Sequence, residues 1–262
     1  MTTAARVLGG LPIALEFLTP LRFRPVRQHE NRAFAESLGW YPAIGLVIGL
    51  VLLSADELLS EVLPPAPTAA ILVALLALLS GGLHLDGVAD TADGMAVQGD
   101  RERRLSVMRD GTSGPAGVMA LVLLLLLGWS ALASLDGPLR GGALVLGPAV
   151  ARWAVLPVAA IVAPARPDGL GRALHEGVWP VAAPLATLIA GVAAVLLFGF
   201  GGLVVMLIAA GAALAMARLA ARLIGGLTGD VFGASIEAAQ LATWLSVVAA
   251  QQREWLDPGL LG

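Results

Sequence analysis

The sequence has no cysteine and no lysine, and it has few charges of either sign. Without cysteine the chain forms no disulfide, holds no metal through thiolates and offers no cysteine nucleophile. Without lysine it forms no Schiff base with a substrate and lacks the lysine of phosphate-binding P-loops. Charged residues make up 13% of the chain, against about 25% in an average soluble protein. No long polar block interrupts the sequence, so a separate soluble domain is not expected.

Apolar residues, in contrast, make up 58% of the chain, and the mean hydropathy is +0.85. Both values are typical of an integral membrane protein. A helix needs about 20 mostly apolar residues to cross a bilayer. The sequence therefore predicts one all-α, polytopic transmembrane domain over residues 1–262. Its expected spans are 40–60, 67–85, 114–134, 142–162, 181–199, 203–224 and 233–250.

Two segments of this plan need separate comment. Only the sequence GFGG separates the fifth and sixth spans, and together they are about twice as long as one crossing requires. We therefore expect a tight hairpin there rather than one long broken helix. Residues 4–21 carry leucines at helical spacing, followed at once by arginine. They are expected to form either an interfacial helix or an ordinary packed N-terminal helix.

The arginines gather in alternate loops. They lie in 22–32, 99–110 and 163–180 and at the end of the sixth span, whereas 54–66, 135–141 and 200–202 contain only Arg140. Loops rich in arginine stay in the cytoplasm. This pattern predicts a cytoplasmic N-terminus, with every arginine-rich loop on the same side and the C-terminus on the other.

Three carboxylates follow the second apolar segment in "GGLHLDGVADTADGM", residues 81–95. If this stretch continues the helix, Asp86, Asp90 and Asp93 share one narrow face. Asp86 and Asp90 are then about 6 Å apart along the helix axis, and Asp90 and Asp93 about 4.5 Å apart. Like charges so placed repel one another. Carboxylate oxygens are the preferred ligands of Mg²⁺, so the row predicts a site for one or two such ions. The alternative is a solvated helix end whose acids face water.

Two neighbouring segments could complete such a site. His84 would point away from the acid face in a straight helix, and it reaches a substrate only if the Gly-Gly pair bends the backbone; otherwise it is a packed or interfacial histidine. In "RRLSVMRDGTSGPAG", Arg109 and Asp110 precede the third span. Arg109 suits bidentate contact with a phosphate. Thr112 and Ser113 lie where free N–H groups of a helix start favour anions. Arg101, Arg103 and Arg104 are interpreted as topological charges only.

A second acidic feature lies in "GGLTGDVFGASIEAAQ", residues 225–240. Asp230 and Glu237 are seven positions apart and share one face of the seventh span. Glu237 and Arg152 lie inside otherwise apolar segments, where an ionisable residue suggests a function. The alternative for these two is a structural ion pair between spans.

At these residues the sequence resembles the cobalamin synthase family of adenosylcobinamide-GDP ribazoletransferases. "GGLHLDGVADTADG" is similar to the family signature, and "LTGDVFGASIE" is nearly as specific. The segments "FLTPLRF", "YPAIGLVIG", "MRDG" and "DGLG" match family segments in the same order. One departure is Gln240, at a position where many members carry an acid.

The resemblance implies a reaction and a site. The 5′-hydroxyl of α-ribazole would attack the cobinamide-side phosphate of adenosylcobinamide-GDP and release GMP, with Mg²⁺ as cofactor; α-ribazole 5′-phosphate is the alternative acceptor. Asp86, Asp90, Asp93 and Asp230 would hold the metal, and Asp93 and His84 are the candidate catalytic groups. Substrate would contact Arg109, Asp110, Thr112, Ser113, Arg152 and Glu237. The setting would be the cytoplasmic face of a bacterial inner membrane.

Two other functions fit parts of the pattern. A CDP-alcohol-type phosphotransferase also gathers acids at a cytoplasmic membrane face, although its own motif is not present here. A cation transporter would use intramembrane acids, but such sites usually lie near the bilayer midplane, whereas the acid row follows a full apolar segment. No nucleic-acid partner is expected, and the chain is either a monomer or a homo-oligomer.

Overall fold

The computed structural model describes residues 3–23, 31–165, 172, 174–175, 181–256 and 259–261. Within these residues the fold is all-α, as predicted, and the one β contact is an isolated bridge between Pro164 and Leu227. The elements are α1 (Thr3–Leu18), α2 (Asn31–Ser37), η1 (Leu38–Trp40), α3 (Tyr41–Ser60), α4 (Pro65–Leu79), α5 (Leu83–Ala96), α6 (Arg101–Val107), α7 (Pro115–Ala133), α8 (Gly137–Trp153), α9 (Val155–Ile161), α11 (Ala182–Ile224), α12 (Gly229–Gln251) and η2 (Gly259–Leu261).

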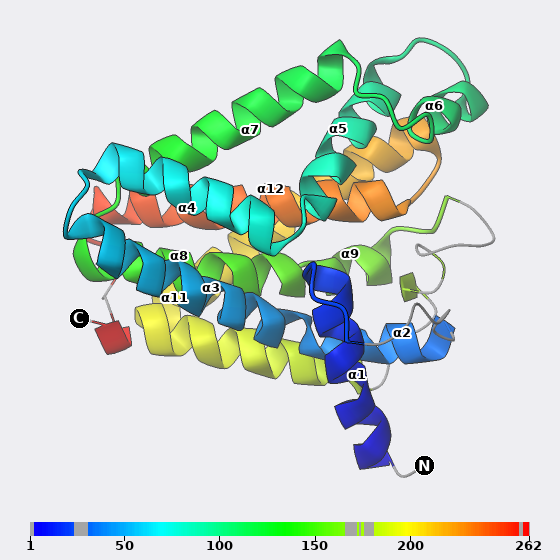
Figure 1. Cartoon of the computed structure of the whole chain (residues 1–262). Coiled ribbons are helices and arrows are strands. Elements are labelled where there is room, and N and C mark those ends of the chain that lie inside the picture. The colour runs from blue at the N-terminus through cyan, green and yellow to red at the C-terminus, as the bar shows by residue number, and fades with distance from the viewer. Residues whose placement is uncertain are drawn as a thin grey trace.

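The long apolar helices form a bundle around α8. Helices α3, α4, α7, α8, α11 and α12 run along a common direction (Figure 1). Every residue of α8 from Arg140 to Trp153 is buried, whereas most of α7 faces outward. Helices α3, α11 and α12 pack directly against α8. The helix with the least lipid-facing surface therefore provides the core on which the others are assembled.

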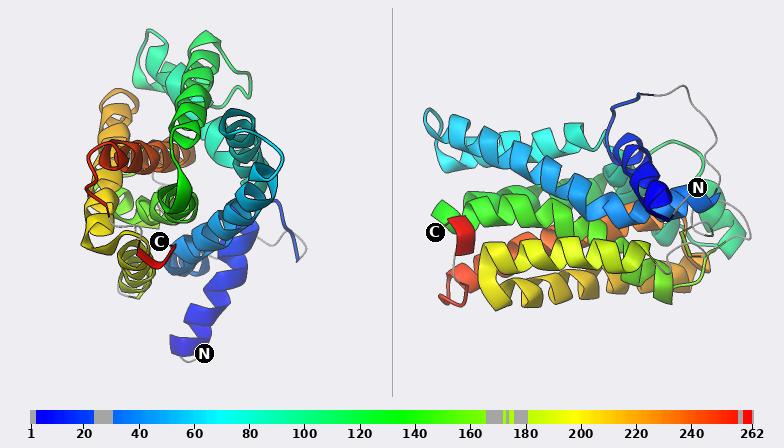
Figure 2. Two further views of the ribbon diagram at one scale, coloured as in Figure 1. Left: turned by 90° about the vertical axis from the view of Figure 1, so that its left-hand side faces the viewer. Right: turned by 90° about the horizontal axis from the view of Figure 1, so that it is seen from below.

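Five helices among the described residues are long and apolar enough to cross a membrane, and the bent pair α4–α5 gives a sixth candidate. Helix α11 runs over 43 residues, but its backbone leaves the helical region at Phe198 and Gly199. There the chain turns back on itself (Figure 2), and a Cβ on Gly202 would collide with the carbonyl group of Ala194. The expected hairpin is thus confirmed, and it raises the apolar segments to the seven that the sequence predicts.

The predicted second span is wrong at its end. The sequence predicts this span over 67–85, but α4 stops at Leu79 and α5 turns away from it by 90°, which is the bend at the Gly-Gly pair that the sequence analysis gives as the alternative. Gly81 and Gly82 make this turn with φ angles of 62° and 70°, a left-handed conformation that glycine adopts without steric cost. As a result α5 does not continue along the bundle; it lies across one end of it (Figure 1).

The N-terminal helix α1 shares features of both interpretations of residues 4–21. Its second half packs on the bundle: Leu18 is buried, and the ring of Phe17 contacts those of Phe34 and Tyr41. Leu8, by contrast, is 64% exposed. The arginines at 24, 27 and 166 and the segment 168–171 lie outside the described residues.

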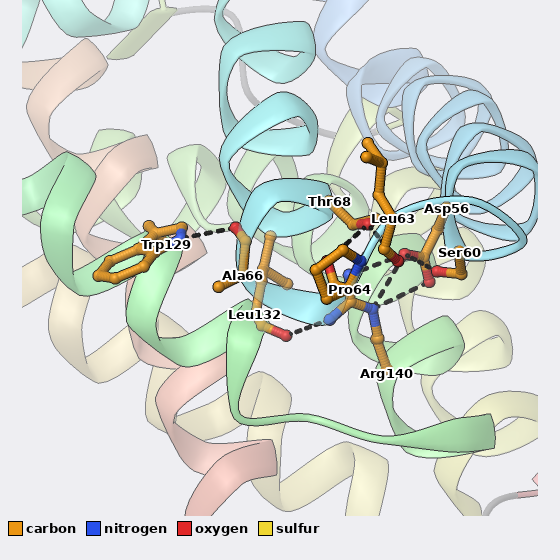
Figure 3. Close-up of polar contacts among 9 residues, drawn as sticks. All are labelled: Asp56, Ser60, Leu63, Pro64, Ala66, Thr68, Trp129, Leu132 and Arg140. Carbon is orange, nitrogen blue, oxygen red and sulfur yellow. Dashed lines mark hydrogen bonds and ion pairs between the residues drawn. The ribbon is translucent and has the colours of Figure 1, made fainter.

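An ion pair closes the opposite end of the bundle, far from α5. The guanidinium of Arg140 in α8 donates from Nη2 to Asp56 Oδ1 of α3 at 2.8 Å and from Nη1 to the carbonyl oxygen of Leu132 at 2.6 Å. Figure 3 shows this contact beside the α3–α4 turn. Arg140 is 6% exposed and Asp56 is 8% exposed. One buried side chain therefore ties together α3, α8 and the end of α7.

Candidate functional site

The acid row lies where α5 crosses the start of α12. The two helices touch at Gly87: a Cβ added there would lie 2.6 Å from the carbonyl oxygen of Asp230 and 3.2 Å from the Cα of Gly233. Only glycine permits this approach without displacing one helix. The contact brings the first turns of α5 beside the first turn of α12. Two motifs that are far apart in the sequence therefore meet at one end of the bundle.

The carboxylates at this crossing interact through their charges. Asp86 is exposed, and Asp90 and Asp230 are half-buried. Partial burial, followed by the negative charges of Asp86, Asp230 and Asp93, raises the pKa of Asp90 from 3.8 to about 6. Helix α5 lies across the end of the bundle, so this carboxylate is outside the long helices that run along it. Among the described residues no ion pair involves Asp90, and a bound cation would relieve the repulsion between these carboxylates.

Asp93 has a structural partner that the sequence did not indicate. Its two carboxylate oxygens accept hydrogen bonds from the backbone N–H groups of Gly114, at 2.6 Å, and Gly117, at 2.8 Å. It is 8% exposed. An anion at a helix N-terminus is stabilised by the free N–H groups and the helix dipole. Asp93 thus fixes the start of α7 to α5, while its metal and base roles stay predictions.

This contact changes the interpretation of the loop before α7. The free N–H groups at that helix start were expected to bind an anionic ligand near Thr112 and Ser113. Two of those donors instead bind the chain's own Asp93. Arg109, Asp110, Thr112 and Ser113 are all exposed on the loop that follows α6. Their contacts with a phosphate stay predictions. Such contacts would be made by these side chains, because two backbone N–H groups at the helix start already bind Asp93.

Arg101 and Arg104, which the sequence analysis interprets only as charges that keep their loop in the cytoplasm, make specific contacts in the structure. Arg104 donates from Nη1 to the carbonyl oxygens of Gly94, at 3.1 Å, and Met95, at 2.6 Å, at the end of α5. Arg101 donates from Nε to the carbonyl oxygen of Ile224 at the end of α11, at 3.0 Å. Cations at helix C-termini are favourable because the last carbonyl groups lack helical partners. Helix α6 therefore holds the ends of α5 and α11 together, which the one-dimensional pattern could not reveal.

The buried polar residues form a second group behind the acids. His84 in α5 is 2% exposed, and its Nε2 has no hydrogen-bond partner among the described residues. Arg152 in α8 is 1% exposed and donates from Nη1 to the carbonyl oxygen of Pro148 at 3.1 Å. The positive charge of Arg152 acts on both His84 and Glu237. Among the described residues Arg152 and Glu237 form no ion pair, and Arg152 Nε has no hydrogen-bond partner, so both the functional and the structural interpretation of these two residues stay predictions.

The donor set at the crossing suits a hard cation. Among the described side chains, no group of three or more His, Cys, Asp and Glu residues is already arranged around a metal position. Mg²⁺ does not require such a group, because it is usually bound by one or two carboxylates together with substrate phosphates. Asp86, Asp90 and Asp230 supply oxygen donors from two helices. The residues present therefore fit Mg²⁺ bound jointly with a phosphate-bearing substrate.

Comparison with known proteins extends over almost the whole chain. Residues 10–248 match the family model of cobalamin-5-phosphate synthase. The adenosylcobinamide-GDP ribazoletransferase of Pseudomonas entomophila (strain L48) is 44% identical over 232 residues, which cover 88% of this chain and 94% of the relative. The enzyme of the same name from Pseudomonas paraeruginosa (strain DSM 24068 / PA7) is 42% identical over 244 residues, covering 92% and 98%. No solved structure matches the chain.

Proposed function

Because the chain belongs to the cobalamin-5-phosphate synthase family, we propose that it is an adenosylcobinamide-GDP ribazoletransferase. It joins adenosylcobinamide phosphate to α-ribazole, or to α-ribazole 5′-phosphate, at the last assembly step of cobalamin. The observation that supports a phosphate-transfer site most directly is the meeting of α5 and α12 at Gly87, which gathers carboxylates from both ends of the chain.

The reaction exchanges one phosphate ester bond for another. A free ribose hydroxyl of the ribazole attacks the phosphorus on the cobinamide side of the pyrophosphate, and the bond from that phosphorus to the bridging oxygen breaks. In α-ribazole 5′-phosphate the 5′-oxygen is already esterified, so the reacting hydroxyl belongs to another ribose carbon. GMP leaves with the bonding electrons, and the hydroxyl proton passes to a base. Asp93 was predicted as that base. Both of its oxygens already accept N–H groups of α7, so its role as base stays a prediction.

A protein promotes phosphate transfer mainly by positioning the reacting groups and by neutralising the negative charge of the phosphate oxygens. Asp86, Asp90 and Asp230 would hold Mg²⁺, which neutralises phosphate oxygens when bound. Arg109, exposed on the loop between α6 and α7, would contact the GDP phosphates through its guanidinium group. The whole site would face the cytoplasm, where GTP-derived substrates are made, in agreement with the arginines of α6 and of the loop that follows it beside α5.

The test is a transfer assay on purified protein, with adenosylcobinamide-GDP and either α-ribazole or a lipid alcohol as acceptor. We expect a corrinoid product and GMP with ribazole, and no product with the lipid. Asp86→Asn should abolish transfer while the protein still inserts and purifies, because it removes a metal ligand and relieves repulsion. Glu102→Gln is the matched control, since Glu102 is an exposed acid of α6 outside the site. Near-normal turnover of Asp86→Asn at modest Mg²⁺ would remove the acid row from the mechanism.

The contribution of α12 is tested separately by a Mg²⁺ titration. Asp230→Ala should lower kcat and raise the Mg²⁺ concentration needed for half activity. Asp110→Ala should have a smaller effect on the metal requirement, because Asp110 lies beside Arg109 on the phosphate side of the proposed site. If the Mg²⁺ requirement of Asp230→Ala equals that of the parent, and activity falls only as stability falls, Asp230 is a structural residue of α12.

A further inference from the structure

A cavity of about 210 Å³ lies behind the acid crossing, between α1, α3, α5, α9 and α12. Three aromatic residues line it, one from each of three helices: Phe17, Tyr41 and Phe232. The rings of Phe17 and Tyr41 are stacked, with centroids 6.0 Å apart and planes 20° from parallel. Aromatic faces so arranged favour contact with another flat ring. The cavity therefore offers an apolar, aromatic lining at the end of the bundle that holds the acids.

One buried polar atom of the cavity lining has no partner. The Nε2 atom of His84 makes no hydrogen bond among the described residues, and this side chain is 2% exposed. A buried polar group left unpaired is unfavourable, and in a native structure it calls for an explanation such as a missing ligand. With its proton on Nε2, His84 can donate a hydrogen bond to an acceptor placed in the cavity.

The open side of the same cavity is acidic. Asp86 and Asp230 also line it, and they are the exposed and half-buried members of the crossing. A ligand in the cavity would thus have its buried part beside His84 and Tyr41 and its outer part beside the proposed metal ligands. This order, from apolar interior to acidic mouth, fits a molecule with a flat base at one end and a reacting hydroxyl at the other.

The size of the cavity selects among the substrates of the proposed reaction. Pockets for drug-sized ligands have volumes of about 300–1,000 Å³, so a cavity of about 210 Å³ is too small for a corrinoid or a complete guanosine nucleotide. It suits one fused bicyclic ring. Resting on the function proposed above, we propose that it is the acceptor subsite and that it binds the dimethylbenzimidazole base of α-ribazole.

In this arrangement each part of the base has a counterpart. The two methyl groups and ring faces contact Phe17, Tyr41 and Phe232. The ring nitrogen not bonded to the ribose is a hydrogen-bond acceptor, and His84 Nε2 donates to it. The ribose extends toward Asp86 and Asp230, which brings its reacting hydroxyl to the acid crossing. His84 is then a base-binding residue, and not the catalytic group that the sequence suggested.

The test compares acceptors that differ at one atom. In the riboside of dimethylindole a C–H group replaces the free ring nitrogen, with the shape unchanged. We expect the parent protein to show a KM for this analogue roughly tenfold above that for α-ribazole, since one buried hydrogen bond is lost. His84→Leu should raise the KM for α-ribazole and abolish most of the discrimination, while the KM for adenosylcobinamide-GDP stays constant. His84→Gln, whose amide can donate, should restore part of both.

Two further measurements keep the outcome decisive. Gln240→Met removes another unpaired buried polar atom, which lies outside this cavity, and should leave both KM values unchanged. Free dimethylbenzimidazole should inhibit the parent competitively against α-ribazole and not against adenosylcobinamide-GDP, which requires no variant to fold. Equal use of both ribosides by the parent, or discrimination that persists in His84→Leu, would overturn the base subsite alone. A parent protein that makes no corrinoid product from α-ribazole would instead overturn the proposed function.

Discussion

Replacing Gly87 by alanine tests whether the contact between α5 and α12 positions the acids. A Cβ at Gly87 would lie 2.6 Å from the carbonyl oxygen of Asp230, about 0.8 Å inside an ordinary contact. The obstructing atom belongs to the backbone of α12, so it cannot rotate away as a side chain would. Helix α5 must therefore move outward, and Asp86 and Asp90 must move with it, away from Asp230.

The size of the effect follows from this displacement. A shift of about 1 Å at a reacting centre can lower a rate by about a hundredfold, so we expect kcat/KM of Gly87→Ala to fall by roughly tenfold to a hundredfold. Stability should change much less. Overpacking costs about 1–3 kcal/mol, and alanine in a helix recovers about 1 kcal/mol relative to glycine. The variant should insert, purify and melt within a few degrees of the parent.

The assay is the ribazole transfer rate as a function of Mg²⁺, with thermal unfolding measured in the same detergent. Gly211→Ala in α11 is the matched control, because a Cβ there meets nothing within 4 Å, and it should keep the parent's activity. We expect Gly87→Ala to need more Mg²⁺ for half activity, since its acids are drawn apart. A Gly87→Ala variant with the turnover and Mg²⁺ requirement of the parent would refute the idea that this contact assembles the site.

Three other outcomes are expected. Asp93→Asn should lower the free energy of unfolding by about 1–3 kcal/mol, because one charge-assisted bond to the start of α7 is lost; a Mg²⁺ requirement equal to the parent's would show that Asp93 is not a metal ligand. Asp56→Asn and Arg140→Met should each cost about 3–5 kcal/mol as measured by unfolding in detergent, because each leaves a buried charge unpaired, and the double variant should cost less than their sum; additive losses would contradict the pairing. A reporter in 98–108 should read cytoplasmic and one in 60–66 should read the opposite side, and the reverse result would place the acids away from their substrates.

The helices and their order could be predicted from the sequence because each depends on local composition. Long apolar runs predict α3, α7 and α12 close to their observed bounds. The hairpin within α11 followed from length alone, since a single crossing cannot use so many apolar residues. These features need no knowledge of what packs against what.

The sequence indicates candidate residues for the site, but it does not predict how the structure arranges them. The acid row was placed on a continuing helix, whereas Gly81 and Gly82 turn α5 by 90°. Two glycines permit such a turn, but its direction is set by the packing of Gly87 on α12, a contact between distant parts of the chain. The capping of α7 by Asp93 likewise depends on a contact between two separate helices. Helical periodicity places side chains on a face and says nothing of which helix that face meets.

The crossing of α5 and α12 also has a consequence for how the protein is made. Helix α5 lies in the first half of the chain, whereas α12 is its last long helix. During synthesis the acid row therefore emerges from the ribosome well before Asp230 exists, and it stays incomplete while the intervening segments enter the membrane. Truncated or stalled chains would contain the signature motif but lack its counterpart. Activity would appear only when translation is complete, so an unfinished copy in the membrane could not turn over substrates.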